Sequence, residues 1–272
     1  MKKKLAAGIL LSAFLVYLSV RGIDFEQVAD GLHAVRGGYA LLFLFVILVM
    51  QWLRSVRWGL MLNPLDRVDQ LSLFSVTSVG FLAITALPAR LGELARPYLI
   101  TKKSRITMPA ALGTILVERV FDSAAILLIF AAVLLSNPAL PPWLTTSAVI
   151  VFFITLAMLA AMIWIPAKRD ASMKVLSPLI NRFPGRFAGK LQEMLDHLID
   201  GFMIFRHFRL LAAVSLLSLA IWIIDILAVY SLFFAFDFRL SLMAATVSVI
   251  ILLIGIAIPT APGFIGNWHY AC

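Results

Sequence analysis

Long apolar runs, separated by short polar segments, dominate this sequence. A helix needs about 20 apolar residues to cross a hydrocarbon core of ~30 Å. Five runs approach or exceed that length: residues 5–20, 39–62, 109–135, 143–165 and 210–236. The pattern predicts an all-α fold, a polytopic membrane helix bundle in which these five runs are full spans.

Two further apolar runs are interrupted by proline and glycine. Residues 71–87 lead into Pro88, Gly92 and Pro97, and residues 240–258 lead into Pro259, Pro262, Gly263 and Gly266. Irregular backbone at membrane depth is tolerated only where protein or a water-filled cavity covers it. We expect Pro262, Gly263 and Gly266 to shape an unwound segment that exposes backbone carbonyl and N–H groups.

The distribution of basic residues predicts how the first broken run folds. The N-terminus is lysine-rich and is therefore expected to be cytoplasmic. If residues 71–87 crossed completely, the basic residues that follow would lie outside, against the positive-inside rule. These are Arg90, Arg96, Lys102, Lys103 and Arg105. We therefore predict a re-entrant hairpin that turns near Pro88 and returns over residues 91–100, so that Asp66 and Ser104 both face the cytoplasm.

The same rule orients the remaining runs. Residues 143–165 return to a basic inner loop, and residues 210–236 cross outward again. The second broken run then enters from the opposite side to the first, which is the pattern of an inverted-repeat transporter with a site near the midplane. The inner loop holds an amphipathic stretch, residues 191–202, which we expect to lie at the inner membrane surface.

Composition supports a membrane protein and argues against several other classes. The chain is 62% hydrophobic and 14% charged, against about 45–50% and 25% in soluble domains. Its net charge of +9 is spread over short segments rather than over one stripe, so we expect no nucleic-acid partner. The single cysteine, Cys272, excludes an intrachain disulfide.

The sequence lacks motifs for metal binding, nucleotide hydrolysis and nucleophilic catalysis. The four histidines are scattered without zinc-type spacing, and neither a phosphate-binding P-loop nor a nucleophile elbow is present. We therefore predict no catalytic residue, metal or cofactor, and a single transmembrane domain over residues 1–272 that is not an enzyme.

The first candidate site lies at the first helix break. Arg90, Glu93 and Arg96 are spaced three residues apart, so on a helix they share one face. A guanidinium group binds phosphate through two parallel hydrogen bonds, and a helix starting after Pro88 would add its positive end. The alternative is a basic loop at the membrane surface with an internal Arg–Glu pair.

The second candidate is a set of charges in the middle of an apolar run. Glu118, Arg119 and Asp122 lie within residues 109–135, and together they cost roughly 7.5–10.5 kcal/mol on the insertion scale. We expect them to face the bundle interior, against Arg54, Arg57 or Arg90. They form either a functional site or a purely structural ion network.

Single charges elsewhere leave two interpretations open. Arg54, Arg57 and Trp58 lie near the inner end of the second span, where arginines that reach back to the surface and an interfacial tryptophan are common. Asp225 is the only charge in residues 210–236. It is either a coupling or substrate-binding group or a bond to a neighbouring helix.

Four motifs, in this order, resemble the lysylphosphatidylglycerol synthase transmembrane-region family. They are Arg54-x-x-Arg57-Trp58, the segment from Leu87 to Arg96, Glu118-Arg119-Val120-Phe121-Asp122 and Pro259-x-x-Pro262-Gly263-x-x-Gly266. This family is the flippase-like half of bacterial multiple peptide resistance factors and also occurs as stand-alone membrane proteins. The resemblance implies translocation of an aminoacylated or otherwise modified phospholipid, or of a polyprenyl-linked lipid.

The sequence departs from the family pattern at its end. The family continues past the second Pro-Gly element with an acidic residue and further helix, whereas this chain reads Asn267-Trp268-His269-Tyr270-Ala271-Cys272. We therefore expect the C-terminal part of the family fold to be missing. Nothing in the chain corresponds to the soluble aminoacyl-transferase half of the two-part family members.

Together these patterns predict a flippase-like protein of a prokaryotic cytoplasmic membrane that translocates or binds an anionic lipid. Arg90 and Arg96 would hold the head group, and Glu93 with Glu118 and Asp122 would balance its charge. The alternative is a non-transporting accessory component of a lipid aminoacyl- or glycosyl-transfer pathway, whose partner is a separate transferase. A third possibility is a structural partner that positions an enzyme through the basic inner loop.

Overall fold

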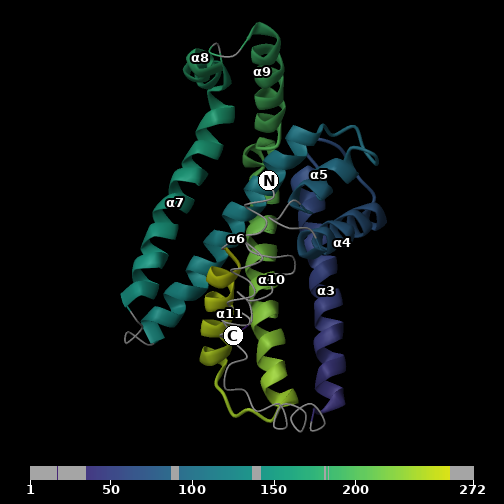
Figure 1. Ribbon diagram of the computed structural model, residues 1–272, viewed down its shortest axis with the longest axis vertical. Coiled ribbons are helices and arrows are strands. Elements are labelled where there is room, and N and C mark those ends of the chain that lie inside the picture. The colour runs from purple at the N-terminus through teal and green to yellow at the C-terminus, as the bar shows by residue number, and fades with distance from the viewer. Residues whose placement is uncertain are drawn as a thin grey trace. The chain divides into compact units, whose positions relative to one another are not determined.

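The computed structural model describes residues 17, 35–86, 92–136, 142–180, 182 and 184–257, and within these ranges it is helical without strands (Figure 1). The all-α prediction is confirmed. The helices are α3 (Gly37–Leu62), α4 (Gln70–Ala86), α5 (Ala95–Ile100), α6 (Met108–Ser136), α7 (Pro142–Ala167), α8 (Arg169–Ile180), α9 (Gly185–Asp200), η2 (Met203–Arg206), α10 (Phe208–Ala235) and α11 (Leu242–Ala257).

Several predicted features lie outside the described residues. They are the first apolar run, the turn with Pro88 and Arg90, the Pro-Gly element with Pro262, Gly263 and Gly266, and residues 267–272.

Helix lengths agree with the predicted division into spans and broken runs. By length and composition, α3, α7 and α10 can cross a membrane, with 26, 26 and 28 residues. The predicted span over residues 109–135 is one unbroken helix of 29 residues, α6, which carries its charges in the middle. The two broken runs are shorter apolar helices, α4 with 17 residues and α11 with 16.

The described chain divides into two compact units. The first contains residues 35–53, 77–86, 92–95 and 221–257, and the second contains residues 54–76, 96–136 and 142–220. The boundaries fall inside α3, α4 and α10, so these three helices contribute to both units.

In the first unit, the start of α3 is joined to the end of α10. Arg36 forms an ion pair with Asp237 at 3.1 Å, and its backbone N–H donates to the carbonyl of Ala235. Tyr39 stacks on Phe234 with ring centroids 5.9 Å apart. A salt bridge between exposed side chains contributes little alone, so the backbone bond and the aromatic contact hold this junction together.

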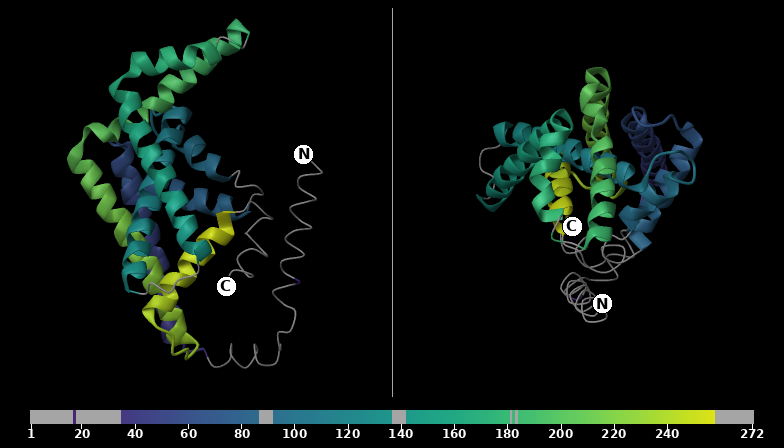
Figure 2. Two further views of the ribbon diagram at one scale, coloured as in Figure 1. Left: turned by 90° about the vertical axis from the view of Figure 1, so that its left-hand side faces the viewer. Right: turned by 90° about the horizontal axis from the view of Figure 1, so that it is seen from above.

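The second unit is built around α6, which packs against α7 and α9. Two glycines allow the approach to α9: a Cβ on Gly201 would meet the backbone at Ala110 and Gly113, and a Cβ on Gly113 would meet the carbonyl of Leu198. Small residues are the usual means by which membrane helices come close. The buried core of this unit includes Trp58, Val117 and Ile204. α8 and α9 project from the end of α7 as a helical hairpin (Figure 2).

A side-chain cap marks the start of α4, and the chain that returns after α4 packs closely against it. The Asp69 carboxylate accepts a hydrogen bond from the backbone N–H of Ser72 at 2.8 Å, which caps the helix and lowers the pKa of Asp69. Beyond the turn, a Cβ at Gly92 would overlap the backbone of Ala83 and Ile84. The returning chain therefore lies directly against the helix that it follows, and only glycine fits there.

The two ends of this hairpin meet. Asp66, which precedes α4, accepts a hydrogen bond at 3.0 Å from the backbone N–H of Arg105, which follows α5. A helix that crossed the membrane completely would separate these residues by the bilayer thickness. The predicted hairpin is therefore confirmed for the first broken run, while its re-entrant position in the membrane, the inverted-repeat arrangement and the cytoplasmic side stay predictions.

We expect the segments before α4 and after α5 to be accessible only from the cytoplasm. In a Cys272→Ser background, the exposed positions Arg67→Cys and Lys103→Cys report on Asp66 and Ser104 without removing their hydrogen bonds. An impermeant maleimide added to intact cells should label neither, whereas Thr146→Cys at the start of α7 should react. Labelling at Lys103→Cys but not at Arg67→Cys would contradict the hairpin.

Candidate functional site

Four buried charged side chains and one half-exposed arginine meet in the second unit. Arg57 comes from α3, Arg96 from α5, and Glu118, Arg119 and Asp122 from α6. We call these five residues the buried ion group. The first two arginines and Glu118 are at most 2% exposed, although each carries a full charge.

Glu118 is the centre of the group. Arg96 forms a two-pronged pair with it, Nη1 to Oε1 at 3.2 Å and Nη2 to Oε2 at 2.9 Å. Nη2 of Arg57 lies 3.1 Å from Oε1, and Nη2 of Arg119 lies 3.4 Å from the same oxygen. Three cations share one carboxylate, which offsets much of the desolvation free energy of burying it.

Asp122 is the second acceptor. Arg57 donates to both of its oxygens and also to the Ser218 hydroxyl at 2.8 Å, which brings α10 into the group. Arg119 approaches Asp122 only to 3.9 Å. Since Glu118 and Asp122 are four residues apart on α6, they lie on one face and receive the same arginine.

Trp58 packs against the guanidinium of Arg96. It is fully buried, and the Arg96 guanidinium lies over its ring at 4.3 Å from the centroid. Its indole N–H donates to Thr114 at 3.1 Å. Trp58 was not among the predicted site residues, although its place beside Arg57 on α3 was the available signal. The stacking holds the guanidinium plane toward Glu118.

The expectation that the α6 charges face the protein interior is confirmed for Glu118 and Asp122, which both contact Arg57, but not for Arg119. Arg57 and Trp58 do not reach back to the membrane surface, because both are buried inside the bundle. The three α6 charges also differ in exposure, since the Arg119 side chain is 43% exposed while Glu118 is 2% exposed. Its position on α6 turns Arg119 outward.

The described residues of the first candidate site, Glu93 and Arg96, do not lie as their spacing predicted. Glu93 lies in a 3₁₀ turn over residues 92–94, and Arg96 lies in the six-residue α5. They therefore do not share one regular helix face, as the spacing had predicted. The fork of Arg96 faces Glu118, so a phosphate that binds Arg96 must displace this carboxylate. Its role in binding lipid stays a prediction.

Two other predicted residues lie on α3 and α10. Arg54 is half-buried on α3, one helical turn before Trp58. Asp225 is half-buried on α10 and belongs to the first unit. The functional assignment of both residues stays a prediction.

Among the described residues, no three His, Cys, Asp or Glu side chains gather as a metal ligand set. The acids of the buried ion group are instead neutralised by arginine. Its charges sum to three positive and two negative, a surplus of one positive charge. The five side chains together therefore carry a net positive charge, which attracts anions.

Comparison with known proteins places this helical architecture in a family. The lysylphosphatidylglycerol synthase TM region model matches residues 5–272. The chain belongs to this family. It is 25% identical to a UPF0104 membrane protein of Methanothermobacter thermautotrophicus, over 98% of this chain and 83% of the relative. A UPF0104 membrane protein of Methanocaldococcus jannaschii is 27% identical, over 68% of this chain and 74% of the relative.

No solved structure matches the chain. The family match agrees with the sequence resemblance and with the spans α3, α7 and α10. As a family member the chain is an integral, multi-pass membrane protein, and the buried ion group lies on helices of its transmembrane region.

We expect Arg57 and Asp122 to stabilise the folded protein as a coupled pair. Arg57→Met leaves two carboxylates short of a buried partner, so it should lower the free energy of unfolding by about 3–5 kcal/mol. Arg57→Met combined with Asp122→Asn should lose less than the two single changes added together. Thermal melting in detergent measures the difference.

Arg119→Met is the matched comparison, because this arginine is half-exposed and makes the longest contacts of the group. It should change the melting temperature little, as should Arg67→Met at an exposed position. Additive losses for Arg57 and Asp122 would show that the two side chains are solvated independently.

Proposed function

We propose that this protein binds the anionic head group of a membrane lipid at the buried ion group and moves it across the membrane in a flippase-like manner. The lipid is a modified phospholipid or a polyprenyl-linked lipid. The observation that carries the proposal is the surplus positive charge, whose half-exposed member, Arg119, lies near the middle of a membrane helix.

A purely structural network has no need of a third arginine. Arg57 and Arg96 already balance Glu118 and Asp122 in charge. An extra arginine at the centre of a membrane helix costs roughly 2.5–3.5 kcal/mol on the insertion scale. A lipid phosphate would neutralise it and accept a two-pronged hydrogen bond. Arg57 Nε, which has no hydrogen-bond partner among the described residues, adds a further buried donor.

The hairpin offers a way to couple binding with movement. Its return arm, α5, is tied to α6 by the Arg96–Glu118 pair. A phosphate drawn in by Arg119 competes with Glu118 for the same guanidinium groups, and this competition would loosen α5. We propose that the first broken element gates the path in this way, and that the second broken element gates it from the other side.

The alternative function is an accessory membrane component that binds a lipid carrier for a separate transferase. The completeness of the two-pronged Arg96–Glu118 pair favours it, because such a pair holds α5 in place. Under either function we place the protein in the cytoplasmic membrane of a prokaryote with its N-terminus inside. Retention of lipid without translocation would favour the alternative.

We expect Arg119→Gln to retain about tenfold less anionic lipid than the parent protein, because one charge-assisted contact is lost. Arg119→Lys should fall between the two, since it keeps the charge but not the planar fork. Native mass spectrometry of the purified protein measures retained lipid, and head-group translocation is followed in vesicles of phosphatidylcholine and phosphatidylglycerol.

The matched control is Arg105→Gln, an exposed arginine that lies outside the buried ion group. It should retain lipid and translocate at the parent rate. If Arg119→Gln is folded, keeps its lipid and moves it as fast as the parent, the buried ion group is structural only and the proposal fails.

A further inference from the structure

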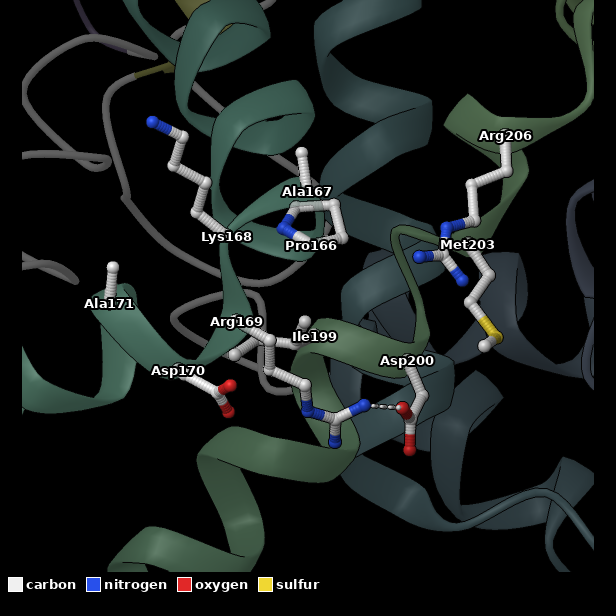
Figure 3. A pocket seen from close by; sticks show the side chains of 10 residues that line it. All are labelled: Pro166, Ala167, Lys168, Arg169, Asp170, Ala171, Ile199, Asp200, Met203 and Arg206. Atoms are coloured by element: carbon white, nitrogen blue, oxygen red, sulfur yellow. Dashed lines mark hydrogen bonds and ion pairs between the residues drawn. The ribbon is translucent and has the colours of Figure 1, made fainter.

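A second candidate site lies away from the buried ion group, where α7 meets the α8–α9 hairpin. A cavity of about 510 Å³ opens between the α7–α8 junction, the end of α9 and η2 (Figure 3). Its charged lining includes Lys168, Arg169, Asp200 and Arg206. We call it the junction pocket. All of its lining residues belong to the second unit.

The chain places the junction pocket at the level of lipid head groups. Lys168 directly follows the last residue of α7, and Arg206 stands two residues before the start of α10. Both helices are apolar enough to span a membrane, so their ends mark the edge of the hydrocarbon core. Trp164 and Phe208 are 47% and 82% exposed beside these ends, as aromatic residues at the interface are.

One arginine of the pocket is already satisfied by protein groups. Arg169 donates to Asp196 at 3.1 Å and to Asp200 at 2.9 Å, and also to the carbonyl of Asp196 at 3.0 Å. Partial burial would lower the pKa of Arg169, but its hydrogen bonds to the two carboxylates outweigh this effect and raise it. His197 lies 3.4 Å from the second oxygen of Asp200. This pairing ties α8 to α9 and forms a fixed wall.

The other two cations are differently placed. The side chains of Lys168 and Arg206 are exposed and form no hydrogen bond or ion pair with any described residue. Lys168 comes from the α7 side and Arg206 from the η2 side, with the Arg169–Asp200 pair between these elements (Figure 3). The lining carries three cations and two carboxylates, and Asp170 is the one lining carboxylate that Arg169 does not engage. Asp196, a third carboxylate, which Arg169 binds, lies outside the lining.

We propose that the junction pocket binds the phosphate group of a membrane lipid, with Arg206 as the main donor, Lys168 as the second charge and Met203 and Ile199 against the apolar part of the lipid. A guanidinium fork matches two phosphate oxygens, and a lysine adds a flexible point charge. The volume suits a head group, since small-molecule sites commonly enclose 300–1,000 Å³.

This site goes beyond the proposed function, because it concerns binding at the membrane surface and needs no transport step. It rests on that function only in naming a lipid as the source of the phosphate. A soluble phosphate ester carries the same phosphate group, and the experiment below distinguishes the two sources.

The test measures binding to the full chain in detergent by native mass spectrometry, with short-chain phosphatidylglycerol and, separately, inorganic phosphate as probes. Arg206→Gln should weaken phosphatidylglycerol binding about tenfold, and the change combined with Lys168→Gln should weaken it further. Arg206→Lys should restore part of the affinity. Size-exclusion elution checks folding.

Matched controls are Arg209→Gln and Lys174→Gln, which remove equally exposed cations outside the pocket. Both should bind as the parent does. Loss of lipid binding confined to the pocket variants supports the lipid site, and loss of inorganic phosphate binding as well supports the phosphate site with a soluble source. Equal lipid loss in the controls, or none in Arg206→Gln, overturns the proposal, whether or not Arg119→Gln alters translocation.

Discussion

The carboxylate of Glu118 is the constraint on which the second unit depends. It lies near the middle of an apolar helix, where an unpaired charge would be expelled from the membrane. Arg96 and Arg57 hold it from α5 and α3, and Arg57 continues to Asp122 and Ser218. Through this one carboxylate, α6 becomes a stable membrane helix and three other elements are fixed around it.

The re-entrant hairpin follows from the same interaction. A six-residue helix such as α5 is not stable by itself, but the Arg96–Glu118 pair, the stacking on Trp58 and the Asp66–Arg105 hydrogen bond hold its return path. Irregular backbone at depth requires such cover by protein. The ion pair that makes the hairpin possible is also the contact that an incoming phosphate would challenge, so stability and gating would depend on one set of side chains.

The buried ion group and the junction pocket, both on the second unit, differ in their surroundings. The buried ion group lies among apolar helices, where electrostatic interactions are strong and selective. The junction pocket lies near the end of α7 and the start of α10, where water and salt would weaken the attraction of an anion. Weak capture at the surface and tight recognition at depth would suit a protein that handles one class of anionic lipid.

The sequence by itself determined the membrane class, the apolar runs and the break after α4, because hydropathy, proline and the positive-inside rule act locally along the chain. It also determined that Glu118 and Asp122 share one helix face. Only the tertiary structure decided that Arg96 pairs with Glu118 and Arg57 with Asp122, residues 22 and 65 apart in sequence. It likewise decided that Trp58 stacks on Arg96 and that Arg206 lines the junction pocket, because several contacts are open to each side chain and packing alone selects among them.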